Sequence, residues 1–307
     1  MQANGDARQV EETYSAVNET AVFVEYFTDP LCSWSWAFEA QWRRLRYECA
    51  GRLSWRYRMG GLIADWQSYN DPFNDIRNPA QMGPQWLQVH EMSGMPLDER
   101  IWQSDPPASS YPACIAVKAA ERQGQATVEV YLRRLREAAM MERRNIAHRD
   151  ILLAVAEQTA CDSAEGTALD LDRFSTDLYA PETVEAFRQD LRDAAYYGIG
   201  RFPTLIFRQL DGRGIVLVGY RPYEVLCDAL EHLAPGLRLS PQLPQEDLAV
   251  AYVRHWHRVT ARELSEVPGI TPTESTVLLK SLVAKGRLMQ VDDSQSETPI
   301  YVPTQGD

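Results

Sequence analysis

The 307-residue sequence has no Cys-x-x-Cys pair and no long apolar run, and each of these two absences excludes a class of protein. It also has only three lysines, which does not bear on its chemistry. Its net charge of −12 disfavours nucleic acids and anionic membranes as partners, because their phosphate groups repel an acidic surface. No stretch reaches the ~20 apolar residues of a membrane span. Residues 1–20 are expected to form a polar leader, without the apolar segment of a secretory signal. We therefore expect a cytoplasmic protein.

The five cysteines are scattered along the chain, which excludes a disulfide scaffold and a zinc site. No other metal site is expected, since the histidines lie in separate predicted elements without partners at ligand spacing. Cys114 and Cys227 lie on the apolar faces of predicted helices, where cysteine is usually a small core residue. Cys32 differs from them because it directly follows a predicted strand.

The first part of the chain predicts a strand, a helix and a second strand. Residues 21–28 are rich in β-branched and aromatic side chains, which indicates a buried strand. From Cys32 to Leu45 apolar residues recur at helical spacing, and residues 53–59 alternate as a second strand would. Such a βαβ unit pairs its two strands in parallel.

The middle of the chain, at about 70–197, contains helical patterns and no convincing strand. The clearest helices are expected at 112–123, 128–142, 149–158 and 182–197. Strand patterns return at 203–208 and 215–218, and a closing helix follows at 222–233. We therefore predict one α/β domain over residues 21–235, in which strands from both ends form one mixed sheet and the helical stretch is an insertion.

A proline-punctuated linker at 236–245 separates this domain from a smaller module at 246–305. Three helical segments and a hairpin predict a winged-helix-like module. From Ser240 onward it has six cations against nine acids, which does not favour the basic stripe of a DNA-binding surface. A protein contact or a structural role is expected instead.

The position of Cys32, after a strand and at a helix N-terminus, suits thiol chemistry. Free N–H groups and the helix dipole favour the thiolate, so we expect the pKa of Cys32 to lie below the ~8.5 of free cysteine. A second signal is Phe202-Pro203-Thr204 at the start of a strand, where an X-Pro bond is a candidate cis peptide. The backbone at Phe202 is suited to pairing with an extended substrate segment.

Three segments, in this order along the chain, resemble the DsbA family of thioredoxin-like proteins. They are FTDPLCSWSW at 27–36, SSYPA at 109–113 and GIGRFPT at 198–204. The resemblance covers about residues 21–235 and implies a thioredoxin-like fold with an inserted helical domain, in which a nucleophilic Cys32 faces Pro203. It also implies that Trp34, Phe202, Pro203 and Thr204 line the substrate groove.

The sequence departs from the dithiol members of that family at Ser35, where they have a second cysteine. A serine hydroxyl cannot resolve a mixed disulfide, so this motif cannot cycle as a dithiol oxidase. Cys49 lies more than two helical turns from Cys32 and is a poor substitute.

Three interpretations of this site follow. The preferred one is a thiol-disulfide oxidoreductase in which Cys32 alone forms a mixed disulfide with a protein, with glutathione or with another low-molecular-weight thiol, and no cofactor is tightly bound. In the second, the groove binds a partner protein without redox chemistry. The chain then resembles adaptors that deliver a redox-sensing transcription regulator to a ClpXP-type protease. In the third, it resembles kappa-class glutathione transferases and chromene-carboxylate isomerases, which have serine-based sites, with Trp34, Ser35 and Trp36 binding a thiol cofactor.

Two carboxylates, Glu25 and Asp29, are candidates for tuning the site. A carboxylate near Cys32 would raise the pKa of its thiol and could shuttle a proton. Asp29 also fits the ordinary chemistry of an Asp-Pro turn. Glu25 lies in an apolar strand, where a charged group is costly to bury without a compensating partner.

Overall fold

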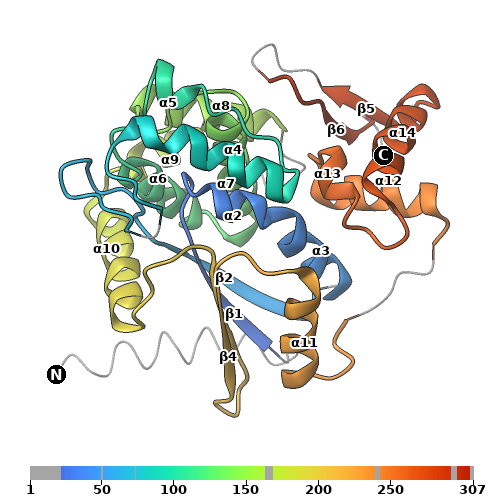
Figure 1. The fold of residues 1–307 in the computed structure, drawn as a ribbon, viewed down its shortest axis with the longest axis horizontal. Coiled ribbons are helices and arrows are strands. Elements are labelled where there is room, and N and C mark those ends of the chain that lie inside the picture. The colour runs from blue at the N-terminus through green and yellow to red at the C-terminus, as the bar shows by residue number, and fades with distance from the viewer. Residues whose placement is uncertain are drawn as a thin grey trace.

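The computed structural model describes residues 22–49, 51–72, 74–162, 169–238, 243–291 and 296–304, which form a larger and a smaller part (Figure 1). The expected leader at 1–20 and part of the expected linker lie outside the described residues. Within the described ranges, no helix is long and apolar enough to cross a membrane.

The larger part is built on a four-stranded sheet with strand order β2-β1-β3-β4. Its strands are β1 (Val22–Thr28), β2 (Leu53–Met59), β3 (Thr204–Arg208) and β4 (Gly214–Val218). β1 pairs in parallel with β2 and antiparallel with β3, and β3 pairs antiparallel with β4. The mixed sheet predicted from the two ends of the domain is therefore confirmed.

Helices cover both faces of this sheet. They are α2 (Ser33–Ala37), α3 (Glu39–Cys49), α10 (Pro181–Tyr196) and α11 (Tyr223–Leu233). Tyr26 of β1 points toward α3 and meets the ring of Trp42 edge-on. Phe27 points to the opposite face, as alternation along a strand requires, and packs against Ala194 of α10.

The stretch from Cys32 to Leu45 is not one continuous helix. α2 ends at Ala37 and α3 begins at Glu39, with Phe38 between them. Trp36, before the break, donates from Nε1 to the carbonyl of Pro96 in the helical insertion. Trp42, after it, donates to the Tyr57 hydroxyl on the sheet. The two halves therefore contact different parts of the domain.

The insertion consists of helices, as predicted, with one isolated β-bridge between Asp71 and Ile76. Its elements before α10 are the 3-10 helix η1 (Pro79–Gln81), α4 (Met82–Ser93), α5 (Ile101–Ser104), α6 (Tyr111–Glu121), α7 (Gln125–Met140), α8 (Arg149–Asp162) and α9 (Leu171–Asp177). The sequence analysis identified α6, α7, α8 and α10 but not α4, α5 or α9.

The smaller part contains three helices and a hairpin. They are α12 (Gln245–Trp256), α13 (Ala261–Leu264), α14 (Pro272–Ala284), β5 (Leu288–Val291) and β6 (Ile300–Pro303). These elements have their own apolar core. We call this part the C-terminal module; its likeness to winged-helix modules remains a prediction.

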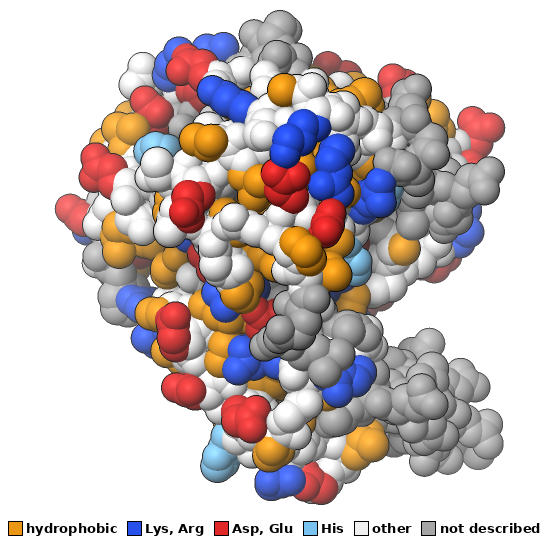
Figure 2. Space-filling view, turned by 90° about the vertical axis from the view of Figure 1, so that its right-hand side faces the viewer, with side chains coloured by type: hydrophobic (Ala, Val, Ile, Leu, Met, Phe, Trp, Pro, Cys, Tyr) orange, Lys and Arg blue, Asp and Glu red, His pale blue; other side chains and the backbone are white. Residues whose placement is uncertain are grey.

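Basic side chains on the C-terminal module are accompanied by acidic ones. Figure 2 faces the side of the molecule that carries the module, and blue and red side chains are interspersed on it. Lys285 pairs with Glu246, and Arg287 pairs with Asp247. The cations beyond the end of α14 therefore have carboxylates of α12 beside them.

Buried ion pairs attach the C-terminal module to the larger part. Glu263 of α13 is fully buried and accepts hydrogen bonds from Arg43 of α3 at 3.0 Å and from Arg133 of α7 at 2.7 and 2.9 Å. Glu137 of α7 binds Arg133 at 2.6 Å and Arg258 of the module at 2.8 Å. Charged groups out of contact with water need such partners. Each part of the molecule therefore supplies counter-charges for buried groups of the other part.

Candidate functional site

Cys32 lies where β1 gives way to α2, and it occupies the N-cap position of that helix. The side chain is 5% exposed, and its Sγ donates a hydrogen bond to the carbonyl of Phe202 at 3.6 Å. The peptide between Phe202 and Pro203 is cis, as predicted. We call residues 201–203 the proline loop. The structure brings it together with Cys32, although 170 residues separate Cys32 from Phe202.

Hydrogen bonds and a close glycine contact fix the proline loop. The Thr204 hydroxyl donates to the carbonyl of Arg201 at 2.7 Å, and Gly219 N–H donates to the carbonyl of Pro203 at 2.7 Å. A Cβ at Gly60 would lie 2.0 Å from the ring of Phe202, so only glycine fits there.

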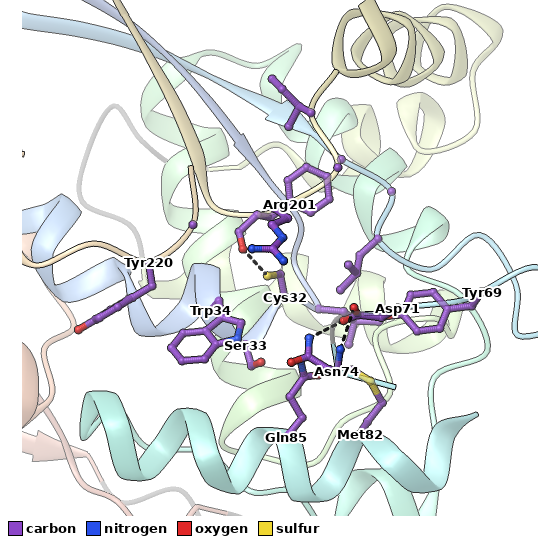
Figure 3. Close-up of a pocket in the computed structure, with 18 of the residues that line it drawn as sticks. Cys32, Ser33, Trp34, Tyr69, Asp71, Asn74, Met82, Gln85, Arg201 and Tyr220 are labelled. Atoms are coloured by element: carbon purple, nitrogen blue, oxygen red, sulfur yellow. Dashed lines mark hydrogen bonds between the residues drawn. The ribbon is translucent and has the colours of Figure 1, made fainter. Parts of the chain in front are cut away.

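A cleft of about 730 Å³ opens at Cys32 (Figure 3). Its lining comes from α2, the 60–74 loop, α4, the proline loop and the residues after β4. Trp34 lies at one side, where its ring packs against that of Tyr220 with centroids 5.6 Å apart. Of the predicted groove residues, Trp34 and Phe202 line the cleft, whereas Pro203 and Thr204 are buried behind it.

Asp29 lies fully buried beside Cys32 and organises the base of the cleft. Its carboxylate accepts hydrogen bonds from Leu31 N–H at 2.8 Å, Leu62 N–H at 2.7 Å and the Ser110 hydroxyl at 2.8 Å. The Cys114 thiol donates to the same carboxylate at 3.2 Å. Burial raises the pKa of Asp29, while these hydrogen bonds act to lower it.

The electrostatic state of Cys32 differs from the sequence-based expectation. Burial raises the pKa of its thiol above the ordinary value; hydrogen bonds from Ser35 oppose this shift, and the charge of Asp29 adds to it. The expected lowering of the pKa is therefore wrong. α2 has only five residues, so its dipole is short, and a thiolate at this buried position loses its hydration.

Ser35 and Glu25 have different relations to the cysteine. Ser35 is fully buried in α2, and it acts to lower the pKa of the Cys32 thiol. The side chains of Glu25 and Tyr26, consecutive residues of β1, point to different faces of the sheet. Tyr26 is on the same face as α2, because its hydroxyl contacts the carbonyl of Ser35. The carboxylate of Glu25 pairs with Arg58 and Arg208, each at 2.9 Å. Asp29 therefore contacts the site as predicted, whereas Glu25 has its partners on the other face.

The C-terminal module contacts Tyr220, a residue that lines the cleft, which the sequence analysis did not anticipate. Tyr220 accepts a hydrogen bond from Gln41 at 3.0 Å, and the charge of Arg262 in α13 acts on its hydroxyl. Arg262 also donates to the carbonyl of Ser93 at the end of α4. Arg262 of the module therefore lies next to Tyr220, which lines the cleft, without lining the cleft itself. No local sequence pattern indicated this contact, because it joins segments far apart in the chain.

Metal ligands do not gather at this site. Within the described ranges, no group of three or more histidine, cysteine or carboxylate side chains could hold a metal ion. The chemistry that the cleft offers is that of one thiol, one buried carboxylate and a set of aromatic and arginine side chains.

Comparisons with known proteins agree with this geometry. A family model described as thioredoxin matches residues 26–228. The chain is 28% identical over 264 residues to the ClpXP adapter protein SpxH of Halalkalibacterium halodurans, covering 85% of this chain and 83% of that protein. SpxH of Bacillus subtilis is 27% identical over 271 residues, covering 87% of this chain and 84% of that protein.

A solved structure shares the fold. The cytosolic disulfide reductase DsbM from Pseudomonas aeruginosa superposes with a TM-score of 0.53 at 23% identity, covering 69% of this chain and 100% of that one. The SpxH alignments are longer than the chain that precedes α12, so they include part of the C-terminal module. The fold, the cis proline opposite Cys32 and the family match agree, and the chain belongs to the thioredoxin family as a DsbA-like member resembling protease adaptors.

Proposed function

We propose that this chain is an adaptor that binds a partner protein at the Cys32 cleft and presents it to a ClpXP-type protease. The observation that carries the proposal is the C-terminal module: Arg262 of the module acts on Tyr220, a residue that lines the cleft, and the SpxH adapters share part of the module. A protein that bound at Tyr220 would lie beside both parts of the chain.

The state of the thiol supports binding over catalysis. Ser35 leaves the motif without a resolving thiol, and the raised pKa keeps Cys32 protonated at neutral pH. A protonated, buried thiol is a weak nucleophile. The sequence analysis preferred the oxidoreductase because Cys32 lies at a helix N-terminus beside a candidate cis proline; the structure has both features, but the pKa of the thiol is raised rather than lowered.

A second candidate, monothiol chemistry with a protein or with glutathione, is favoured by one observation. The Sγ of Cys32 contacts the carbonyl of Phe202 beside the cis proline, where an incoming disulfide segment would lie. The serine-based interpretation has no comparable support, because Ser35 is fully buried.

A degradation assay separates these candidates. The wild-type chain and Cys32→Ser would be expressed in cells that lack the native gene, and protein half-lives would be measured across the proteome with and without active ClpXP. We expect one or a few proteins to be shortened in half-life by both forms, and only when the protease is active. If no half-life depends on the chain, and if Cys32→Ser instead loses reduction of a glutathione mixed disulfide, the monothiol function replaces the adaptor.

A further inference from the structure

The residues that line the cleft have the composition of a protein-binding surface. Eight of the 25 described lining residues are aromatic, methionine or arginine, namely Trp34, Tyr69, Tyr220, Phe202, Met82, Met92, Arg201 and Arg221. Among the lining residues that the structure describes there is no lysine, and Asp71 is the only carboxylate. Interface centres are enriched in the former types and depleted of lysine, aspartate and glutamate.

We propose that the occupant of this cleft is an extended acidic segment of a partner protein. Its carboxylates bind Arg201 and Arg221, and an apolar side chain packs against Trp34 and Tyr220. This inference rests on the proposed function and specifies the chemistry of the partner.

The first step of the argument is the charge of the cleft. Among the described residues, two arginines, Arg201 and Arg221, and one carboxylate, Asp71, line the cleft. Both arginines are exposed. In a chain of net charge −12, this edge of the cleft is locally positive and attracts a segment of opposite sign.

The second step is the orientation of the two guanidinium groups. Arg201 precedes Phe202 in the proline loop, and Figure 3 shows its guanidinium beside Cys32. Arg221 follows β4, and its Nε donates to the carbonyl of Val218 at 3.0 Å, which holds the side chain at the cleft. Guanidinium groups bind carboxylates in bidentate geometry, so two of them at one edge suit a segment with two acidic residues.

The third step is the apolar surface at the mouth of the cleft. Met92 is 62% exposed and Val218 is 40% exposed, and both line the cleft. A small thiol at Cys32 would leave these side chains in water. A protein segment that continues beyond the cleft would cover them, and exposed apolar side chains beside a polar rim mark such contacts.

Selection from a random peptide library tests the proposal without knowledge of the partner. The full chain would be immobilised and exposed to phage that display random twelve-residue peptides, and bound peptides would be sequenced. We expect Asp and Glu to be enriched, together with a large apolar residue. A selection that yields no binder, or neutral or basic peptides, overturns the proposal. Glutathione binding in calorimetry, together with an empty selection, assigns the cleft to a small anionic thiol instead.

Charge reversal provides the matched control. The double variant Arg201→Glu/Arg221→Glu should bind the acidic peptides at least about tenfold more weakly, the loss expected for hydrogen bonds to charged groups. It should also select Lys- and Arg-rich peptides. The variant Arg188→Glu/Arg213→Glu changes the net charge equally at exposed positions of α10 and the β3–β4 turn, and it should behave as wild type. Equal loss in both double variants would show a general charge effect and overturn the assignment.

The result is separable from the adaptor function. Acidic peptides that bind through Arg201 and Arg221, with no half-life dependent on the chain, support this inference and refute protease delivery. Delivery that is unaffected by Arg201→Glu/Arg221→Glu supports the adaptor and refutes this inference.

Discussion

At the scale of residues, burial and a helix N-terminus have opposite effects on the pKa of the Cys32 thiol. Its position after a strand and at a helix start was predictable from the pattern of apolar residues. The sign of its pKa shift was not, because it depends on contacts made only in the folded chain. Phe202 covers the thiol from 170 residues away, and Asp29 is held in place by Ser110, 81 residues away.

The pKa of Cys32 can be measured from the pH dependence of alkylation. Because the folded-state pKa is raised, the thiolate forms only as the pH rises above the ordinary range of cysteine. We expect the midpoint for iodoacetamide at Cys32, followed by peptide mass, to lie above the ~8.5 of free cysteine. Asp29→Asn removes a negative charge whose field raises this pKa, so its midpoint should be lower.

Glu25→Gln is the matched control, because Glu25 is a buried carboxylate of the same sheet that faces the opposite side. It should leave the midpoint of Cys32 unchanged. A wild-type midpoint below 8.5 would contradict the role of burial. An equal shift in both variants would contradict the assignment of the effect to Asp29.

At the scale of elements, two helices of the C-terminal module begin with the same local device. Thr260 and Glu263 form a capping box at α13, and Thr271 and Glu274 form another at α14. The sequence analysis predicted helical segments here at 260–267 and 271–285 without using these caps, although such caps are local. It could not distinguish them in function. Only Glu263 is buried against arginines of another part of the chain.

Substituting glutamine at each capping position separates the local role from the buried ion pair. Glutamine retains the cap but removes the charge. Glu263→Gln removes one of the two buried carboxylates of Arg43 and of Arg133, which keep Glu39 and Glu137, and should lower the free energy of unfolding by roughly 1.5–3 kcal/mol, the value of a hydrogen bond to a charged group. Glu274→Gln, at an exposed cap, should have only a small effect. Urea unfolding of both variants measures the difference, and equal losses would show that the interface arginines contribute nothing through Glu263.

Two of the three helices that the sequence analysis missed are short, whereas α4 has twelve residues. α5 has four residues and α9 has seven, too few for a helical period to stand out. The break at Phe38 was also invisible, because the apolar spacing from Trp34 to Leu45 continues across it. Tertiary contacts of Trp36 and Trp42 decide the path of the chain there.

At the scale of the whole molecule, the two predicted units proved to share a buried network of charges. Composition and linker prolines indicated separate units. The contacts that join them could not be predicted, because Arg133 and Glu263 are 130 residues apart and Arg43 and Glu263 are 220 apart. Burial alone would raise the pKa of Glu137, but Arg258, Arg133 and Arg134 outweigh it and hold that pKa well below its ordinary range.

This network makes stability depend on pH in acid. The folded-state pKa of Glu137 is depressed, so its contribution is present above the unfolded pKa of ~4.3 and is lost as the pH falls below it. We expect the free energy of unfolding to fall by about 1.4 kcal/mol per pH unit for this carboxyl. Unfolding curves from pH 5 to 3 should show a shallower slope for Glu137→Gln. An unchanged slope would show that other groups bind the protons.

The pairing of Arg133 with Glu263 also has a consequence during synthesis on the ribosome. Arg133 leaves the ribosome 130 residues before its partner, an interval of about 6 to 26 s at ordinary rates of translation. For that time Arg133 and Arg43 have Glu137 and Glu39 beside them but lack Glu263, so the nascent thioredoxin-like part has buried arginines with only part of their counter-charge. The last step of folding therefore waits for the last fifth of the message, and a ribosome that stalls there leaves an incomplete domain for the chaperones and proteases of the cell.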